Sequence, residues 1–401
     1  GSTVQGRPFQ VETSFTTWLE ISLNAAEPER HWEVINCGGV SYASYRLLPI
    51  LDEVLQHQPD LIIIYTGHNE FLEARTFEHI ESRGELLNAT LASASRLRSF
   101  TLFREGYLQM RGRSSHEPPP GRPILPAEVE ALLDYRGGLE EYHRDCQHRE
   151  DVVRQYHYNL RRMIEVARRA GVDMILVNPV SNLRDCPPFK SLPGDKLTPE
   201  DEERWRSLCH RASQKLRSNQ PGALLEATAL YEEACELDPH HAGGFYNLAQ
   251  CYDAAGRTAE AHDSYRRAKD LDICPLRILG PMNESVLEVA QQTRTPLVDA
   301  QALFAARSAD GIVGARWLID HVHPSITGHQ LLADALADEM VQLGIVDPQP
   351  DWDTTRRQRY RQHFEALPDI YFDQGSQRLE AVRAWALGRA DRIRPDDDAE
   401  P

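Results

Sequence analysis

Two short segments rich in apolar residues constrain the fold of this chain more than any other feature. Residues 60–66 (Asp-Leu-Ile-Ile-Ile-Tyr-Thr) and 172–178 (Val-Asp-Met-Ile-Leu-Val-Asn) are typical of strands buried on both faces, as in a parallel sheet. Shorter apolar runs at 32–36 and 296–299 predict two further strands, and the apolar spacing over 152–170 predicts a helix between strands. Strands that alternate with helices favour an α/β fold in which helices cover both faces of a parallel sheet.

The composition is that of an acidic, globular chain. Asp and Glu number 61 against 44 Lys and Arg, so the formal net charge at pH 7 is −17 over 401 residues. An acidic surface disfavours nucleic acid and anionic lipid as partners, because phosphate groups are bound by clustered Lys and Arg. We expect no membrane-spanning segment, because no stretch of about 18 apolar residues occurs. Seven cysteines without a Cys-x-x-Cys pair predict no metal site, and we expect no cofactor.

An internal repeat lies within residues 195–276. Five residues recur 34 positions further on: Ala227, Tyr231, Ala234, Leu237 and Asp238 correspond to Ala261, Tyr265, Ala268, Leu271 and Asp272. A period of this length resembles the tetratricopeptide repeat, in which small residues let paired helices approach closely. We therefore expect an all-α insertion of this type. Two roles stay open for it, namely docking of a protein partner or service as a structural cap.

Polar segments directly follow three of the predicted strands. They are residues 36–39 (Asn-Cys-Gly-Gly), 67–70 (Gly-His-Asn-Glu) and 178–182 (Asn-Pro-Val-Ser-Asn). Because chemistry gathers at the carboxyl ends of parallel strands, we expect these segments to share one site. Within it, His68 and Asn182 are candidates for contacts with a substrate.

Two further segments, far apart in the sequence, carry the parts of a nucleophile and its base. Ser2 lies in a turn bounded by Gly1 and Gly6, and His323 follows Asp320 by three residues. A hydroxyl becomes a good nucleophile when an imidazole removes its proton, and the imidazole needs a carboxylate to hold its tautomer. We therefore predict that Ser2 is the nucleophile, His323 the general base and Asp320 the residue that orients it. Without the other segments, His323, which precedes a proline, would be better explained as a structural helix-entry residue.

These blocks, in this chain order, resemble the SGNH (GDSL-like) hydrolases, and the resemblance covers about residues 1–75, 150–190 and 280–343. It implies a flavodoxin-like three-layer α/β/α sandwich with a parallel sheet, whose first strand, before Ser2, is missing from this chain. It also implies an oxyanion hole formed by the backbone N–H groups of Ser2 and Gly38 and the side-chain amide of Asn69.

The resemblance implies a serine esterase or lipase that acts on a carboxylic ester through an acyl-enzyme. An O-acetyl or short-chain ester of a carbohydrate or other small molecule is the expected substrate. An O-acyltransferase with the same triad would pass the acyl group to a sugar hydroxyl, and the sequence does not separate these two reactions. A third hypothesis is a non-catalytic interaction protein in which the helical repeat is the working part.

These segments predict an order of domains. The hydrolase core is expected at 1–73, 151–194 and 277–345, with a helical lid at 74–150, the tetratricopeptide-like insertion at 195–276, and a helical C-terminal extension with an acidic tail at 346–401. Proteins that resemble this one are often exported or anchored to a membrane by an upstream segment, and we expect the same arrangement here.

Overall fold

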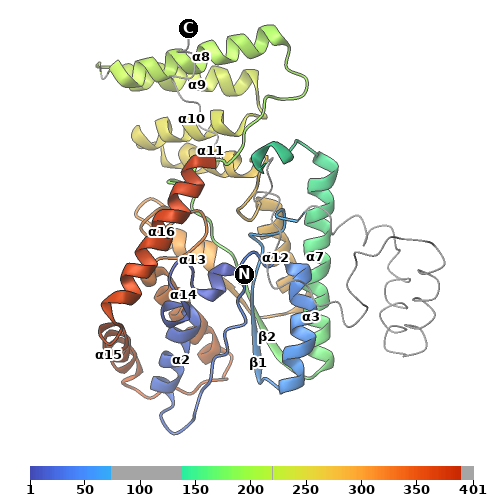
Figure 1. Ribbon diagram of the computed structural model, residues 1–401, viewed down its shortest axis with the longest axis vertical. Helices are drawn as coiled ribbons and strands as arrows, with labels where there is room; N and C mark the ends of the chain where they lie inside the picture. Colours follow the sequence, from blue (N-terminus) through green and yellow to red (C-terminus); the bar gives the residue numbers. More distant parts are fainter. Residues whose placement is uncertain (74–137, 219, 390–401) are drawn as a thin grey trace, which may run out of the picture. The chain divides into compact units, whose positions relative to one another are not determined.

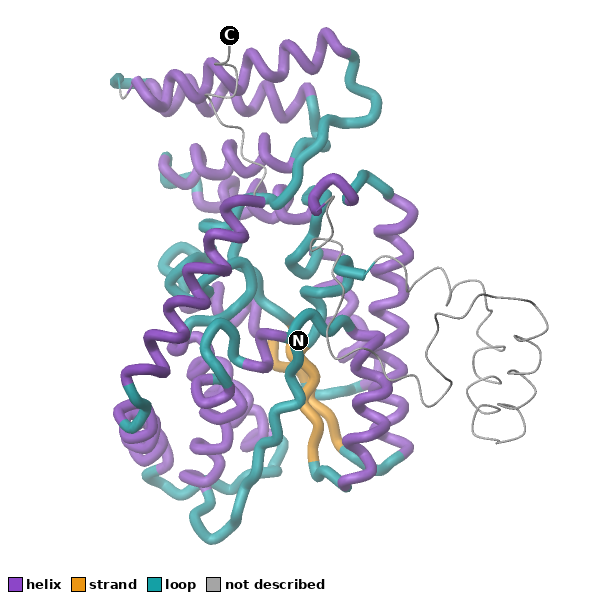
Figure 2. The backbone as a smooth tube through the Cα atoms, viewed as in Figure 1, coloured by secondary structure: helices purple, strands orange, loops and turns teal. Residues whose placement is uncertain are grey.

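The computed structural model describes residues 1–73, 138–218 and 220–389. Three parallel strands form one sheet with β2 at its centre: β1 (Leu61–Tyr65), β2 (Asp173–Asn178) and β3 (Leu297–Asp299). They are the orange parts of the tube at the middle of Figure 2. Each strand lies within one or two residues of an apolar run in the sequence, because a strand buried by helices needs apolar side chains on both faces.

Residues 32–36 form no strand, contrary to the sequence prediction. Their main-chain N–H groups donate to side chains instead, from Trp32 to Asn24 Oδ1 at 3.1 Å and from Val34 to Glu20 Oε2 at 2.7 Å. Both acceptors lie on helix α2 (Phe15–Ala26). The segment is therefore bonded to a helix where the prediction had a neighbouring strand.

Helices dominate the described residues, so the predicted α/β fold class, a three-layer α/β/α sandwich, is wrong. Thirteen α-helices stand beside a sheet of three strands within the described ranges. The excess of helix comes from the repeat region and the C-terminal part, whose described residues contribute no strand. Besides α2, the helices are α1 (Ser2–Gln5), α3 (Ser44–Val54), α7 (Cys146–Arg169), α8 (Pro199–Ser218), α9 (Ala223–Leu237), α10 (Ala242–Ala254), α11 (Thr258–Asp270), α12 (Gly280–Thr293), α13 (Ala300–Arg307), α14 (Ile326–Gln342), α15 (Trp352–Glu365) and α16 (Asp369–Arg389), with 3₁₀ turns at η1 (Val11–Thr13), η2 (Leu55–His57) and η5 (Gly138–Glu141).

The sheet is packed between helices that come from distant parts of the sequence. Helix α7 packs against α3 and α12, and both α7 and α12 contact β2; α14 packs against α2 and contacts β3 (Figure 1). The largest core cluster joins these elements through fully buried side chains, among them Trp18, Leu19, Ile175, Phe304, Leu332 and Leu336. Burial of each such side chain contributes about 1.5–3 kcal/mol relative to exposure.

Helices α8 to α11 form a separate cluster, drawn in yellow-green to yellow in Figure 1. Helix α8 packs against α9, and α10 against both α9 and α11. The alanines of the 34-residue repeat are buried where these helices meet, as at Ala227 and Ala261, and the repeat tyrosines Tyr231 and Tyr265 fill the space between helices. Small residues at these positions allow the close approach that the repeat pattern predicts.

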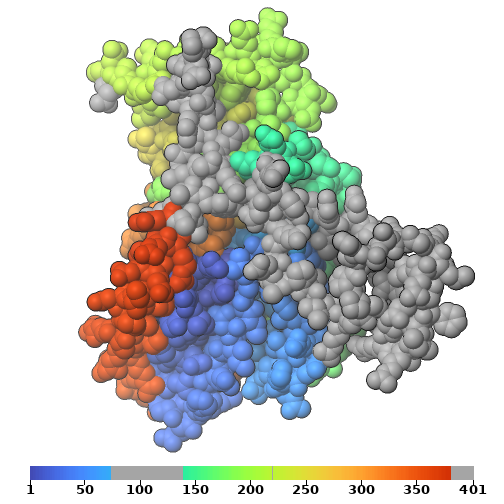
Figure 3. Space-filling view, in the orientation of Figure 1, coloured from blue at the N-terminus to red at the C-terminus, as the bar shows by residue number. Residues whose placement is uncertain are grey.

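The two C-terminal helices pack on the N-terminal part of the chain. Trp18 of α2 meets Tyr360 of α15 edge to face, with ring centroids 5.0 Å apart. Arg378 of α16 donates to the carbonyl oxygens of Pro8 and Phe9, and Figure 3 shows this red helix beside the blue N-terminal residues. Residues 74–137 of the predicted lid (74–150) and the acidic end of the tail from 390 lie outside the described residues.

Candidate active site

Ser2, His323 and Asp320 are joined by hydrogen bonds across 321 residues of sequence. Ser2 Oγ lies 2.8 Å from His323 Nε2, and His323 Nδ1 lies 2.6 Å from Asp320 Oδ2. Ser2 opens the short helix α1, whose C-cap Gly6 has a left-handed φ of 90°. A Cβ at Gly6 would lie 2.5 Å from the carbonyl oxygen of Gln10, so this turn requires glycine.

Asp320, which is predicted to orient His323, is itself held by main-chain groups of its own loop. Its Oδ1 accepts the main-chain N–H groups of Val322 and His323 at 2.9 and 2.8 Å. Burial alone would raise the pKa of Asp320, but the nearby imidazoles of His323 and His321 outweigh burial and hold this pKa well below its usual range. An ionised Asp320 keeps the proton of His323 on Nδ1, so Nε2 can accept the proton of the Ser2 hydroxyl.

Two of the predicted oxyanion donors, Asn69 and Gly38, differ in their availability. Asn69 Nδ2 donates to the carbonyl oxygen of Tyr42 at 3.1 Å, and the same nitrogen lies 3.0 Å from a Cβ built on Gly1, next to Ser2. An amide nitrogen carries two hydrogens, so Asn69 keeps one for a ligand. The N–H of Gly38 is already engaged, because it donates to Asn36 Oδ1 at 2.8 Å. Gly38 lies against α1, where a Cβ would meet the Gln5 nitrogen at 2.4 Å.

Asn182 is bonded to the loop that carries the predicted base, His323. Both the nitrogen and the oxygen of its side-chain amide form hydrogen bonds. Its Nδ2 donates to the carbonyl oxygen of Asp320 at 3.0 Å, and its Oδ1 accepts the N–H of Asp185 at 2.9 Å. Its main-chain N–H donates to the carbonyl oxygen of His321. These contacts position the Asp320 loop.

His68, the other predicted contact residue, is buried in the turn after β1. Its Nδ1 accepts the N–H of Ile278 at 3.2 Å. His321, in the loop of the base, and His329, in α14, are also buried. Burial lowers the pKa of His321 to about 4, which keeps this ring neutral near neutral pH.

Two supporting residues, Asn36 and Glu70, are not assigned a role by the sequence patterns. Asn36 Nδ2 donates to Val4 O at 2.6 Å and to Thr16 Oγ1 at 2.8 Å, so it fastens α1 to α2. Glu70 accepts both the N–H and the hydroxyl of Ser44 at 2.7 Å, at the start of α3. Their positions inside the polar segments after predicted strands are the signal that could have singled them out.

Comparison with known proteins identifies one part of the chain. A tetratricopeptide repeat family model matches residues 230–263, from within α9 to within α11. The predicted 34-residue helical repeat is thereby confirmed, and repeats of this type suggest interaction with proteins. No curated protein and no solved structure matches the chain.

Within the described ranges, no helix has both the length and the apolar character needed to cross a membrane. The described part of the chain also holds no group of three or more His, Cys, Asp or Glu side chains that could bind a metal ion.

Proposed function

We propose that this protein is a serine hydrolase that cleaves a carboxylic ester through an acyl-enzyme. One observation carries the proposal, the continuous hydrogen bonding from Ser2 Oγ through His323 to Asp320. An SGNH-type hydrolase is the proposed family, on the four sequence blocks that contain these residues. An O-acetyl or short-chain ester is the proposed substrate class.

The proposed reaction has two stages. Ser2 Oγ attacks the ester carbonyl carbon while His323 Nε2 takes the hydroxyl proton, and the resulting oxyanion is bound by N–H donors at the site. The tetrahedral intermediate collapses, the C–O bond of the ester breaks, and His323 returns the proton to the departing alcohol. Water then attacks the acyl-enzyme with His323 again as the base, which releases the acid and restores Ser2. A sugar hydroxyl in place of water would make the same site an O-acyltransferase.

Two assays on the full 401-residue chain test the proposal. Wild-type protein should release nitrophenol from nitrophenyl acetate and should be labelled by a fluorophosphonate at Ser2, whereas Ser2→Ala should do neither. Ser213→Ala is a matched control, because Ser213 bonds only Tyr231 within the described part of the repeat. Undiminished hydrolysis or labelling in Ser2→Ala would exclude the proposed chemistry. Adding a sugar acceptor and finding acylated sugar in preference to free acid would favour the transferase.

A second candidate function is protein binding through the helical repeat, favoured by the family match at residues 230–263. Helix α9 carries Leu225, a leucine with 74% of its surface exposed. In cells that lack the protein, restoration of its function by the Ser2→Ala chain but not by Leu225→Asp would favour binding over chemistry. The opposite pattern would favour the hydrolase.

A further inference from the structure

His68 lies in a turn whose shape is fixed by its neighbours. Gly67 has a φ of 139°, and a Cβ at this position would lie 2.6 Å from Ile278 Cδ1 and 3.0 Å from the Tyr156 hydroxyl. That hydroxyl donates to the carbonyl oxygen of Thr66 at 2.9 Å. The turn between β1 and Asn69 is therefore packed from two sides, and the imidazole of His68 has little freedom.

The hydrogen bond from Ile278 determines which nitrogen of His68 carries the proton. Because the N–H of Ile278 donates to Nδ1, that nitrogen must offer its lone pair, and the neutral ring holds its hydrogen on Nε2. Burial, reinforced by the nearby His321 and His323, holds the pKa of His68 well below its usual value. His68 is thus a neutral ring with a fixed donor.

That donor has no acceptor among the described residues. His68 is 6% exposed, and its Nε2 is buried without a hydrogen-bond partner in the described ranges. A buried N–H without an acceptor costs free energy, and native proteins rarely retain one without a use. Here it belongs to the residue that precedes Asn69, whose side-chain nitrogen lies beside the Ser2 turn.

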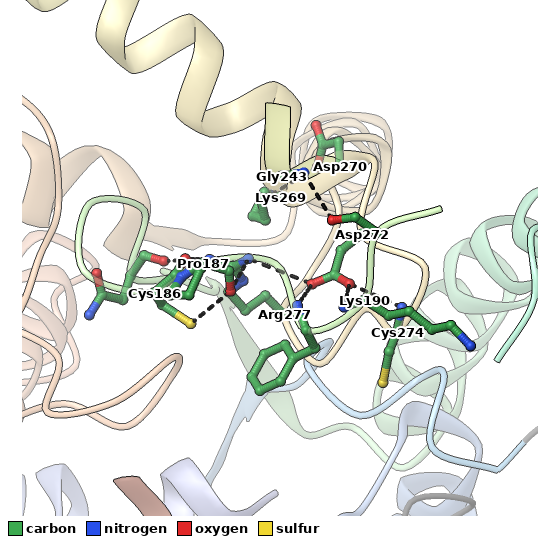
Figure 4. Close-up of polar contacts among 12 residues, drawn as sticks. Cys186, Pro187, Lys190, Gly243, Lys269, Asp270, Asp272, Cys274 and Arg277 are labelled. Atoms are coloured by element: carbon green, nitrogen blue, oxygen red, sulfur yellow. Dashed lines mark hydrogen bonds and ion pairs between the residues drawn. The ribbon is translucent and has the colours of Figure 1, made fainter. Parts of the chain in front are cut away.

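The main chain that fixes this ring is itself anchored to the repeat. Lys269, at the end of α11, is buried and donates from Nζ to the carbonyl oxygen of Ile278 at 2.7 Å. Figure 4 shows the buried ionic network around this junction. Asp272 accepts the N–H groups of Phe189 and Lys190, and Arg277 donates to the carbonyl oxygens of Asn182 and Cys186. The segment that holds His68 is consequently rigid.

We propose that His68 binds the substrate directly, as a neutral donor whose Nε2–H bonds the carbonyl oxygen of the acyl group as that oxygen becomes an oxyanion. This role rests on the proposed hydrolase function. In this proposal His68 takes the place of the Gly38 N–H, which is engaged by Asn36, and acts beside the Ser2 N–H and Asn69 Nδ2. The group that His68 would bind is the carbonyl oxygen of the carboxylic ester proposed above as the substrate.

Kinetics of three variants test this role on the full chain. His68→Phe keeps a planar ring without a donor, and kcat for nitrophenyl acetate should fall about 10²- to 10³-fold with KM nearly unchanged, the effect of losing one oxyanion donor. His68→Gln retains an amide N–H and should recover kcat to within about tenfold of wild type. His329→Phe is the matched control, because His329 also accepts a main-chain N–H at Nδ1 and has a buried, unpartnered Nε2 among the described residues, but stacks on Phe15 in the core. Its kcat should match wild type.

The outcomes separate this inference from the proposed function. Ser2-dependent hydrolysis by wild type with an equal kcat in folded His68→Phe overturns the role of His68 alone. Absence of Ser2-dependent hydrolysis in wild type overturns both. If His68→Phe does not fold, the Nε2 proton of His68 in wild-type protein can be followed by NMR before and after formation of a tetrahedral boronate adduct at Ser2. A downfield shift supports the bond, and an unchanged resonance overturns it.

Discussion

The side-chain amide of Asn182 donates a hydrogen bond to the main-chain carbonyl oxygen of Asp320 at 3.0 Å, across 138 residues of sequence. This bond ties the segment after β2 to the loop that carries Asp320 and His323. A residue that sequence reasoning assigned to substrate contact is thus bonded to the part of the chain that holds the general base. The segment after β2 and the loop before α14 are thereby fixed to one another.

Asn182→Ala should lower both stability and activity. Loss of the bond to Asp320 and of the acceptor for Asp185 leaves buried groups unpaired, which costs about 1–3 kcal/mol of unfolding free energy. Because a misplaced base slows proton transfer, kcat for nitrophenyl acetate should fall by about 10²-fold. Asn24→Ala is the control, because Asn24 bonds the carbonyl oxygen of Trp32 in the same manner but remote from Ser2. It should lose stability and keep kcat, and equal kcat in both variants would contradict the positioning role.

Asp320→Asn should abolish most activity without unfolding the protein. An asparagine cannot stabilise the imidazolium and favours the wrong tautomer of His323, an effect of about 10⁴-fold on kcat in serine hydrolases with this arrangement. Asp310→Asn, which breaks an ion pair with Arg184 elsewhere in the chain, provides the comparison and should retain wild-type kcat. A loss of less than about tenfold in Asp320→Asn would speak against this residue as the orienting carboxylate.

Glu70 should make stability fall as the pH rises. Burial raises the pKa of Glu70 to about 7, although hydrogen bonds from Ser44 act in the opposite direction. The folded chain therefore keeps this proton to a higher pH than the unfolded chain, whose carboxyl has a pKa of 4.5, and the free energy of unfolding decreases between these values. Denaturant titrations at about pH 5 and about pH 8 should reveal a loss of roughly 2–4 kcal/mol in wild type relative to Glu70→Gln. Parallel pH profiles for the two proteins would contradict the assignment.

Asp272 should be among the most costly carboxylates to remove. It is 1% exposed, accepts three main-chain N–H groups, and lies 3.7 Å from the buried guanidinium of Arg277. Asp272→Ala leaves that cation without its counter-charge, and we expect a loss of about 3–5 kcal/mol in the free energy of unfolding. Asp263→Ala removes an exposed ion pair with Arg266 and should change stability by less than about 0.5 kcal/mol. Similar losses in both variants, measured by chemical denaturation, would be inconsistent with the role of burial.

Local patterns in the sequence predict the elements better than they predict the fold. The strands at Leu61–Tyr65 and Asp173–Asn178 could be predicted, because a short apolar run without alternation is typical of a strand that is buried on both faces. The run at 32–36 has the same local character, yet its N–H groups bond Asn24 and Glu20 on α2. Whether such N–H groups bond a neighbouring strand or the side chains of a helix depends on tertiary contacts. The periodicity of the sequence carries no information on these contacts.

Some contacts of the candidate site could likewise be predicted from the sequence, and others could not. The proximity of Ser2 and His323 could be anticipated, because a serine in a glycine-bounded turn and a histidine three residues after an aspartate are the parts of a nucleophile and its base. The engagement of Gly38 by Asn36 could not, since both residues belong to one short segment whose turn is not visible in the sequence. Nor could the bond between His68 and Ile278, which joins residues 210 positions apart through a main-chain N–H. Main-chain donors carry no residue-specific signal.

Ile278 forms hydrogen bonds with both the helical repeat and the histidine through main-chain atoms: its oxygen accepts from Lys269, and its nitrogen donates to His68. Replacement of the isoleucine by another amino acid retains both groups, with proline as the exception because it has no N–H. The isoleucine side chain is itself buried, and its Cδ1 packs on the turn at Gly67, so a substitution there disturbs the turn of His68 through packing even when both hydrogen bonds remain. The residue in the middle therefore holds the repeat and the histidine together both through its main-chain atoms and through its own side chain.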